Sequence, residues 1–443
     1  MFSASEYHSS AMSKTCSFYT QGCRLNISET ASLEQQFKLS GYTIVPFENK
    51  ADIVVVNTCT VTENGDKDTK RLVNKINKTN PHSKIALIGC QSQILKEKLL
   101  TLKNVQWVIG NHEKMNLGEI IANTQGDEKI LQTEKLKREP FTVKTTALDK
   151  KHTRANLKIQ DGCDFYCAFC VIPFARGPAR SRVFEDIIRE AIELTESGHK
   201  ELVLTGVNIG TYEHEDRYFL DICKALIKLP KLFRLRISSI EPTTIPNELF
   251  DLMASEPKMC RYLHIPIQSG SNNILKAMSR KHSTKEFIDT VHYAYTRVPD
   301  ICIGTDVIVG FPGEEKLNFD ETVLTLMTQP IHYFHVFSYS ERPFARSKKI
   351  EKQIPETEIN DRSKRLRELS KKQKIAFYKQ FIGQKLSILV EQEKHGYWNG
   401  LTDNFIRVKF KSTDNLKNKF VTISVTDIDG LSLVGNLDRT SIA

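Results

Sequence analysis

The sequence predicts an α/β protein in three parts: an N-terminal parallel sheet, a central incomplete parallel barrel and a small C-terminal all-β barrel. Short apolar runs alternate with longer amphipathic stretches over residues 15–110, the pattern that strands and helices of a parallel sheet produce. The alternation resumes over residues 155–340, and after residue 385 only strand-like runs remain. The chain of 443 residues is long enough for about three domains. We expect their bounds at residues 13–125, 149–380 and 381–443.

The N-terminal part contains four strand-like runs, and a cysteine follows each of the first three. The runs are SFYT, DIVVVN, KIALIG and VQWVIG. Cys23, Cys59 and Cys90 stand just past the first three runs, and we call them the N-terminal triad. Because the carboxyl ends of parallel strands share one edge of a sheet, we expect these thiols to lie at a common edge. They could hold an iron–sulfur cluster with three protein ligands, or they could be buried structural cysteines.

The central part is predicted to begin near Asp149, after a linker. Residues 111–152 are rich in Lys, Glu, Gln and Thr and show little apolar periodicity, which is typical of a linker and of peripheral structure. Six strand-like runs follow, with helix-like stretches such as 184–197 between them: LKIQD, ELVLTG, FRLRISS, YLHIPI, ICIGTDVIVG and HYFHVFSY. Six βα units in succession predict a partial, TIM-like (β/α)6 barrel whose functional groups lie at the carboxyl ends of its strands.

Residues 351–379 are predicted to form a charged helix that connects the central barrel to the C-terminal part. Beyond it the runs LSILVE, FIRVKF and KFVTISVTDI are separated by Gly, Asn and Asp turns, which predicts a small all-β domain. Its lysines and aromatic residues would suit contact with RNA, although the solvated strands of small β domains are also often Lys-rich. The residues that would make this contact are Lys409, Lys411, Lys417, Lys419, Tyr397, Trp398 and Phe405.

Charge and hydropathy restrict the partners. The formal net charge is +10, which favours a polyanionic partner but equally fits a soluble basic surface. The first residues lack the pattern of a secretory signal, and no apolar stretch approaches the roughly 20 residues that cross a bilayer. We therefore expect a cytoplasmic protein with no membrane partner. The chain could begin at Met1 or at Met12, and we expect the residues before Met12 to form a disordered tail.

Cys163, Cys167 and Cys170, which we call the central triad, follow directly on the run LKIQD at the end of the first barrel strand. Three thiolates can hold three irons of a four-iron, four-sulfur cluster and leave the fourth iron open to an outside ligand. A zinc site would need a fourth ligand, and no His or Cys follows at the usual spacing. The spacing resembles the signature of the radical S-adenosylmethionine enzymes. In those enzymes the open iron binds the amino and carboxylate groups of the cofactor, and reduction releases a 5'-deoxyadenosyl radical.

Polar residues follow the second to fifth barrel strands, in the segments 205–208, 238–242, 264–270 and 310–314. Each segment alone reads as an ordinary turn, but together, in barrel order, they favour a cradle for the cofactor. A glycine at the end of the second strand would let a ligand approach the backbone closely. The residues predicted to bind the cofactor are Gly206, Asn208, Ser239, Glu241 and Gln268.

A basic run, PFARGPARSR, lies just beyond the central triad. Its arginines Arg176, Arg180 and Arg182 would suit phosphates or a bidentate contact with a carboxylate, and a solvated loop fits the same residues equally well. We predict that Arg176 and Arg180 contact the substrate. The remaining cysteines match no ligand motif and are predicted to be core thiols: Cys16, Cys223, Cys260 and Cys302.

The sequences around both triads resemble the methylthiotransferase family, and the resemblance spans nearly the whole chain. Around the N-terminal triad they read QGCRLN, NTCTVT and GCQSQ. The details GCRLN, NTCTVTEN, the stretch 160–182 and SSIEP look most like the MtaB branch, whose members modify N6-threonylcarbamoyladenosine beside the tRNA anticodon. The last β domain looks like a TRAM module, a small barrel that binds RNA.

This resemblance implies two 4Fe–4S clusters, an auxiliary one on the N-terminal triad and a radical-generating one on the central triad. It implies two S-adenosylmethionine molecules per turnover: one donates a methyl group to sulfur at the auxiliary cluster, and the other is cleaved. The C2 hydrogen of the modified adenine in tRNA would be replaced by a methylthio group, with electrons from a donor protein. No oligomeric state is predicted.

Three alternative functions fit the same sequence features. Methylthiolation of isopentenyladenosine in tRNA, or of a ribosomal protein, would use both clusters in the same way. The basic terminal domain disfavours a basic ribosomal protein, since like charges repel. A non-catalytic iron–sulfur RNA-binding protein would not cleave S-adenosylmethionine at all.

Overall fold

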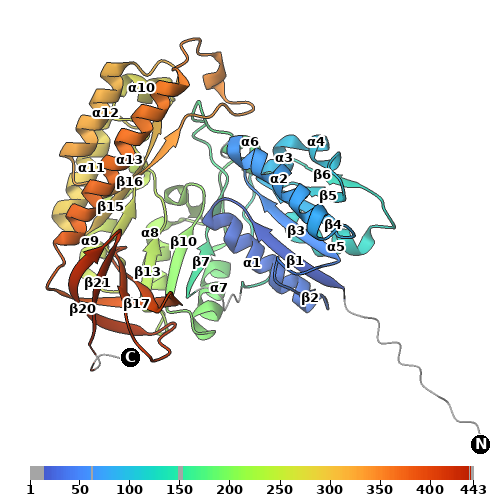
Figure 1. Ribbon diagram of the computed structural model, residues 1–443, viewed down its shortest axis with the longest axis horizontal. Helices are drawn as coiled ribbons and strands as arrows, with labels where there is room; N and C mark the ends of the chain where they lie inside the picture. The colour runs from blue at the N-terminus through green and yellow to red at the C-terminus, as the bar shows by residue number, and fades with distance from the viewer. Residues whose placement is uncertain (1–13, 61–62, 148–152, 439, 441–443) are drawn as a thin grey trace, which may run out of the picture. The chain divides into compact units, whose positions relative to one another are not determined.

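The computed structural model describes residues 14–60, 63–147, 153–438 and 440. The two possible starts, Met1 and Met12, and the predicted boundary near Asp149 lie outside these residues. The chain divides into two compact units. The first comprises Met1–Thr60 and Asn64–Lys135, and the second comprises Val61–Glu63 and Leu136–Ala443. Figure 1 labels their helices and strands.

The first unit is a six-stranded sheet in which neighbouring strands are parallel, in the order β2-β1-β3-β4-β5-β6. Its strands are β1 (Thr15–Thr20), β2 (Thr43–Ile44), β3 (Ile53–Thr58), β4 (Lys84–Gly89), β5 (Val105–Ile109) and β6 (Ile130–Gln132). Its helices are α1 (Arg24–Leu39), α2 (Glu63–Thr79), α3 (Cys90–Leu95), α4 (Glu97–Leu100) and α5 (Leu117–Asn123). All residues of β3 are buried, as in sheets that helices cover on both faces. Phe37 of α1 and Ile121 of α5 belong to one apolar cluster, and Val73 and Ile76 of α2 to another.

The second unit contains the predicted partial barrel of six parallel strands. Its strands are β7 (Arg154–Lys158), β10 (Glu201–Thr205), β13 (Arg234–Ile237), β14 (Tyr262–His264), β15 (Cys302–Val309) and β16 (Tyr333–Ser338). They form two three-stranded sheets, β13-β10-β7 and β14-β15-β16, which the backbone bridges Leu235–Met259 and Ser239–His264 join. Among the described residues β7 and β16 do not pair, so the barrel is open on one side.

Helices cover the outer side of the barrel strands in Figure 1. They are α7 (Phe184–Glu196), α8 (Phe219–Leu226), α9 (Asn247–Ser255), α11 (Thr284–Arg297), α12 (Lys316–Thr328) and α13 (Glu356–Lys379). Amphipathic helices behave in this way because only one stripe of each is apolar. Helix α13 is the predicted charged connector; the hydroxyl of Ser370 bonds the backbone of Phe334 in β16. The predicted fold class is confirmed here.

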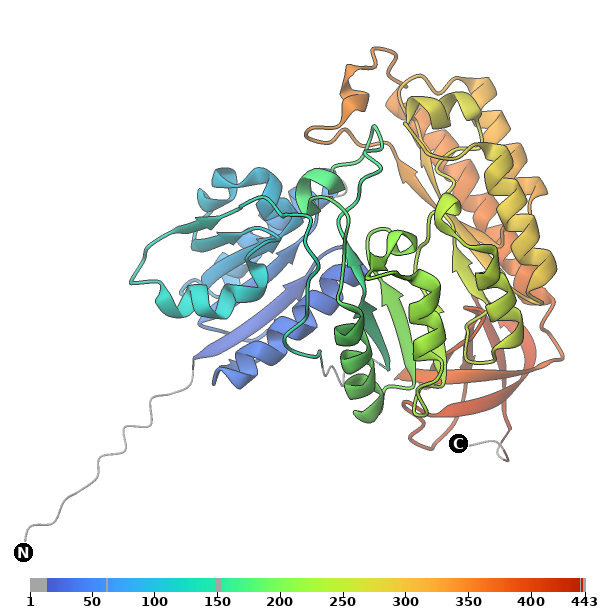
Figure 2. The same cartoon turned by 180° about the vertical axis from the view of Figure 1, so that it is seen from behind.

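The C-terminal part is a closed five-stranded barrel in the order β17-β18-β19-β21-β20. Its strands are β17 (Lys385–Lys394), β18 (Tyr397–Thr402), β19 (Arg407–Phe410), β20 (Phe420–Asp429) and β21 (Ser432–Leu437). The small barrel lies against the amino-terminal ends of the central strands, as both views show (Figure 2). The guanidinium of Arg234 at the start of β13 donates to the backbone oxygens of Leu401 (2.8 Å) and Ser387 (2.9 Å). The small barrel therefore covers the amino-terminal end of the central barrel, and the opposite, carboxyl-terminal end is the one that can hold functional groups.

In the described part of the chain no helix is both long and apolar enough to cross a membrane. The four cysteines predicted to be core thiols, Cys16, Cys223, Cys260 and Cys302, are all buried.

Two buried histidines predict a loss of stability in mild acid. Burial, with a contribution from Arg280, lowers the pKa of His282 to about 4, and burial lowers that of His332 to about 4. The ordinary pKa near 6.5 applies in the unfolded chain. Between pH 4 and pH 6.5 the unfolded state therefore binds more protons than the folded state. The contribution of these histidines to the free energy of unfolding is complete above pH 6.5 and is lost as the pH is lowered toward 4.

We expect urea midpoints to fall between pH 7 and pH 4.5, with a loss of about 1–3 kcal/mol per histidine. His282→Gln and His332→Gln should each flatten this dependence, and His292→Gln, at an exposed position on α11, should not. The same slope in all four proteins would contradict the assignment.

Candidate active site

A tightly held loop presents the central triad after β7. Strand β8 (Gln160–Asp161) pairs with β9 (Arg180–Ser181), and the loop leaves β8 through Gly162 at φ +70°. A Cβ atom on Gly162 would lie 2.0 Å from the Pro178 oxygen, so only glycine fits there. The backbone N–H of Cys163 bonds Gly177 O (3.1 Å) and that of Cys170 bonds Cys167 O (3.0 Å). The predicted position at the carboxyl end of the first barrel strand is where the structure places the triad.

Each sulfur of the central triad accepts a hydrogen bond. The donors are Phe165 N to Cys163 Sγ (3.5 Å), Arg280 Nη1 to Cys167 Sγ (3.4 Å) and Ile172 N to Cys170 Sγ (3.4 Å). A sulfur that accepts such a hydrogen bond suits a thiolate that is bound to a metal.

Burial raises the pKa of Cys163 to about 11 and that of Cys170 to about 12, and it also raises the pKa of Cys167. Reactive cysteine nucleophiles have the opposite shift. As free thiols these three cysteines would therefore be poor nucleophiles.

Arg280, which sequence reasoning missed, links the central triad to a predicted cofactor residue. Its side chain is 3% exposed and forms an ion pair with Glu241 besides its bond to Cys167. Arg280 Nη2 also donates to the Pro266 oxygen (3.2 Å). A planar guanidinium carries five N–H donors in a fixed fork and can therefore reach all three partners at once. No motif in the sequence marked this residue, because its partners come from distant segments.

Among the residues predicted to bind the cofactor, Asn208 has a side-chain amide whose hydrogen-bonding groups are left for a ligand. Its side chain is buried, and within the described part of the chain neither Nδ2 nor Oδ1 has a hydrogen-bond partner. The turn that carries it is fixed by Gln160, whose Oε1 accepts from the N–H groups of Val207 (2.9 Å) and Asn208 (2.8 Å). A Cβ on Gly206 would lie 3.0 Å from Gln160 Oε1, so the glycine allows this close packing. A buried amide without partners fits a site that a polar ligand completes.

Gln268 and Asp306 line a cavity of about 180 Å³ at the carboxyl ends of β14 to β16. Gln268 has a backbone φ of +69°, and its N–H bonds the Asp306 oxygen (2.9 Å). The remaining lining residues are Phe169, Ile308, Phe337, Ser338, Tyr339 and Ser340. Apolar and aromatic walls with a few polar groups are typical of pockets for small molecules and cofactors.

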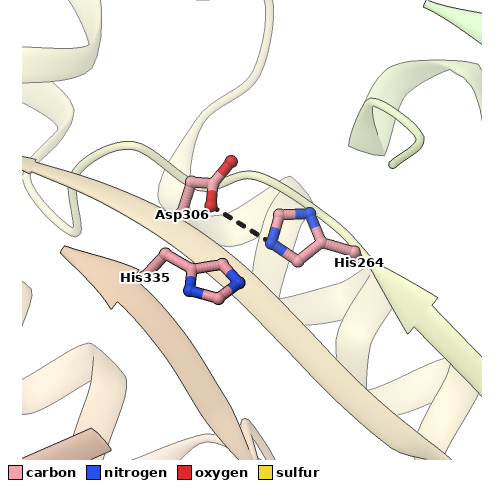
Figure 3. Close-up of side chains that lie close together, drawn as sticks. All are labelled: His264, Asp306 and His335. Carbon is pink, nitrogen blue, oxygen red and sulfur yellow. Dashed lines mark ion pairs between the residues drawn. The ribbon is translucent and has the colours of Figure 1, made fainter. Parts of the chain in front are cut away.

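Three polar side chains point toward one another inside the barrel, one from each of β14, β15 and β16 (Figure 3). His264 Nε2 lies 3.2 Å from Asp306 Oδ1, and Asp306 is the register neighbour of His335. The predicted residue Ser239 lies behind this group, with its Oγ 3.0 Å from His264 Nδ1. Asp306 and His335 were missed in the sequence. The alternation of inward- and outward-facing side chains along β15 and β16 could have placed both of them on the same face of the sheet. These groups add a polar layer next to the cavity that contains Gln268.

The basic run is bound to a buried carboxylate. Asp161 accepts from Arg176 Nη1 (2.9 Å), from Arg180 Nη2 (3.1 Å) and from Lys158 Nζ (2.7 Å). The Arg176 side chain is 1% exposed, so a substrate would have to displace Asp161 to reach it. The predicted substrate contact of Arg176 does not fit this position, and its guanidinium braces the loop instead.

Arg180 is 15% exposed and borders a separate cavity of about 610 Å³ with Arg138 and His214. It therefore remains accessible to a ligand. Arg182, the third arginine of the run, is buried and paired with Asp186 and Glu190.

The N-terminal triad lies at the carboxyl ends of three adjacent strands in the first unit. Cys23 precedes α1 after β1, Cys59 follows β3, and Cys90 opens α3 after β4. Gly22, at φ +92°, packs so closely that a Cβ there would lie 2.7 Å from Cys59 Sγ. Cys23 is exposed and Cys90 is buried. The common edge expected from the sequence is therefore where these cysteines are found.

The C-terminal barrel presents only part of its predicted RNA-binding set to solvent. Lys411, Lys417 and Lys419 are exposed, and Lys409 and Lys411 lie 5.5 and 5.2 Å from the ring of Tyr397. Trp398 is buried, and Phe405 stacks on Tyr262 of the central barrel with ring centroids 4.3 Å apart. Neither ring is free to stack on a base, which corrects the prediction for Trp398 and Phe405.

Comparisons with known proteins agree with this architecture. Residues 157–326 match the model of the radical SAM superfamily, and residues 15–110 match an uncharacterized protein family, UPF0004. Among solved structures, the radical S-adenosylmethionine methyltransferase TsrM from Kitasatospora setae has a TM-score of 0.54 at 13% identity. It covers 76% of this chain and 77% of its own. At that identity the likeness shows the fold alone.

Curated relatives cover nearly the whole chain. The threonylcarbamoyladenosine tRNA methylthiotransferase MtaB of Aquifex aeolicus is 36% identical over 395 residues, which are 88% of this chain and 95% of that protein. MtaB of Bacillus subtilis is 35% identical over 422 residues, 93% of each chain. The tRNA-2-methylthio-N(6)-dimethylallyladenosine synthase of Ehrlichia chaffeensis is 31% identical and covers 94% of this chain and 97% of its own.

The radical SAM superfamily uses a 4Fe–4S cluster and S-adenosylmethionine, and the acceptor sulfurs of the central triad and the unfilled amide of Asn208 fit those groups. The resemblance to MtaB-type proteins seen in the sequence is likewise confirmed. The chain therefore belongs to the radical S-adenosylmethionine methylthiotransferase family.

Proposed function

We propose that this enzyme methylthiolates tRNA and converts N6-threonylcarbamoyladenosine next to the anticodon into its 2-methylthio derivative. The observation that carries the proposal is 35–36% identity, over 88–93% of the chain, to proteins named for that reaction. The relative named for dimethylallyladenosine, at 31% identity, makes that tRNA nucleoside the second candidate. No relative described above is named for a ribosomal protein.

In this proposal the central triad holds the 4Fe–4S cluster, and Arg280 is a positioning residue that fixes Cys167. A cluster held there, with bound S-adenosylmethionine, would supply the radical chemistry that the unactivated C2–H of adenine requires. Gly206, Asn208, Ser239, Glu241 and Gln268 bind the cofactor, and the cavity beside Gln268 and Asp306 takes its nucleoside portion. The apolar walls of that cavity exclude water from the reacting groups.

The N-terminal triad holds a second, auxiliary 4Fe–4S cluster, and two S-adenosylmethionine molecules are used per turnover. The support is the placement of the three cysteines at the ends of three adjacent strands, together with the close packing of Gly22 against Cys59, which leaves no room there for a side chain. Three protein ligands again leave one iron open.

Recognition of tRNA is assigned to Arg180 and to the exposed lysines Lys411, Lys417 and Lys419 of the C-terminal barrel. Neutralisation of phosphates by such side chains would give salt-dependent binding. We place the reaction in the cytoplasm, with electrons from a donor protein, and divide the chain into a methylthiotransferase domain (13–125), a radical SAM barrel (149–380) and a TRAM-like domain (381–443).

Nucleoside analysis of tRNA tests the proposal. In cells that lack the gene and any redundant enzyme, mass spectrometry should show loss of 2-methylthio-N6-threonylcarbamoyladenosine and accumulation of its unmethylthiolated precursor. The intact gene should restore the modification, and so should a Cys16→Ala version, because Cys16 is a buried core thiol. Loss of the dimethylallyl derivative instead would favour the second candidate. Undiminished levels of both nucleosides would refute tRNA methylthiolation.

A further inference from the structure

A chain of buried polar side chains lies behind Cys90 in the first unit. Lys114 Nζ forms an ion pair with Glu29 of α1 and donates to Asn111 Oδ1 (2.7 Å). Asn111 Nδ2 in turn lies 3.6 Å from Cys90 Sγ. All four residues are at most 4% exposed. Asn111 and Lys114 follow β5, the strand that pairs with β4, and Cys90 follows β4. The polar side chains that contact Cys90 therefore come from the neighbouring strand of the sheet.

The ammonium group determines how the Asn111 amide is oriented. An amide has a donor end and an acceptor end, and the two are hard to distinguish by shape. Lysine offers only donors, so the amide oxygen must face Lys114. The NH2 group is then directed at Cys90, and the sulfur has to accept its hydrogen bond. That arrangement is unfavourable for a thiol donor and favourable for a metal-bound thiolate.

Burying Lys114 requires the carboxylate of Glu29. Charged side chains are almost never fully buried without a partner, and replacing such a pair by apolar residues is often neutral or stabilising. The pair therefore contributes little as a source of stability. What it does provide is a fixed donor for the oxygen of Asn111, which holds the amide in one orientation.

We propose that Lys114 and Asn111 are positioning residues of the auxiliary site, which hold an N–H donor on Cys90 and thereby set the reduction potential of the cluster bound there. This inference rests on the proposed second cluster. Hydrogen bonds to cluster sulfurs favour the reduced, more negatively charged state and raise its potential. Groups that support a ligand in this way also retain the metal.

The test uses the full chain with Cys163, Cys167 and Cys170 replaced by alanine, reconstituted anaerobically, so that any remaining cluster reports on the N-terminal triad. Midpoint potentials are measured by redox titration followed by electron paramagnetic resonance, with iron and sulfide content measured on the same samples. Three variants are compared with this parent: Asn111→Leu, Asn111→Asp and Lys114→Met. The matched control is Asn77→Leu, because Asn77 donates to a backbone oxygen, Lys103 O (2.9 Å), and not to sulfur.

We expect Asn111→Leu to shift the midpoint to a more negative potential and Asn111→Asp to shift it further, because the donor becomes an anion with the same shape. Lys114→Met should shift it in the same direction although Lys114 does not touch the sulfur, and iron loss to a chelator should be about tenfold faster in these variants. Asn77→Leu should match the parent. If the parent binds iron but the midpoint potential is the same in the parent and in the Asn111 and Lys114 variants, this inference is refuted and the proposed second cluster is not. A parent without iron refutes the second cluster and the inference with it.

Discussion

Cys59→Ala is expected to abolish methylthiolation while leaving reductive cleavage of S-adenosylmethionine to 5'-deoxyadenosine largely intact, whereas Cys167→Ala should abolish both. The two cysteines belong to different triads on different units of the chain. In our proposal only the central triad serves the reductive cleavage of S-adenosylmethionine, so the formation of 5'-deoxyadenosine should depend on it alone. Both products are quantified by liquid chromatography and mass spectrometry after reduction with dithionite, with tRNA as the second substrate.

The control for this experiment is Cys223→Ala, a buried cysteine of α8 outside both triads, which should keep both reactions. Loss of cleavage in Cys59→Ala would show that the two triads do not have separate tasks. If Cys167→Ala cleaved S-adenosylmethionine as well as the intact enzyme does, the central triad would have no part in the mechanism.

Arg236→Ala is expected to destabilise the second unit by about 3–5 kcal/mol. Arg236 is buried; its Nε lies 2.6 Å from Glu201 Oε1, and its other nitrogens donate to the backbone oxygens of Asp403 (2.8 Å) and Thr402 (3.0 Å). The substitution removes the guanidinium donors of a buried carboxylate and of the Asp403 oxygen where the central and C-terminal barrels meet, and it leaves the Thr402 oxygen with only the longer bond from Phe405 N (3.3 Å). The free energy of unfolding is obtained from urea titrations at pH 7.5.

Two variants make this measurement specific. Arg297→Ala breaks an exposed ion pair with Asp251 and should cost no more than about 1 kcal/mol. Glu201→Leu combined with Arg236→Met should cost less than Arg236→Ala, because no charge is then left buried. Equal stability of Arg236→Ala and Arg297→Ala would contradict the role assigned to this pair.

Local patterns predicted the strands and the positions of the six triad cysteines. Strand β3 reads as a continuous apolar run because helices cover both faces of its sheet, and Cys59 follows it directly. Because the carboxyl ends of parallel strands lie at one edge of a sheet, the cysteines that follow them can be placed at that edge without any knowledge of side-chain contacts. These inferences depend on residues that are close in sequence, or on strand order alone.

Contacts between distant segments could not be predicted in this way. Arg280 lies 113 positions from Cys167, and Lys114 lies 85 positions from Glu29, so neither pairing has a local signature. The basic run misled for the same reason: Arg176 reads as exposed until Asp161 is placed beside it. Phe405 likewise reads as a stacking platform until the central barrel covers it.

Counting iron and sulfide in anaerobically reconstituted protein is the decisive test of whether the chain holds two clusters. We expect about eight irons per chain in the intact enzyme, and about four when either Cys23, Cys59 and Cys90 or Cys163, Cys167 and Cys170 are replaced by alanine. Removing all six cysteines should remove the iron. A chain that binds zinc in place of iron, or whose iron content is unchanged when one triad is removed, would contradict this expectation.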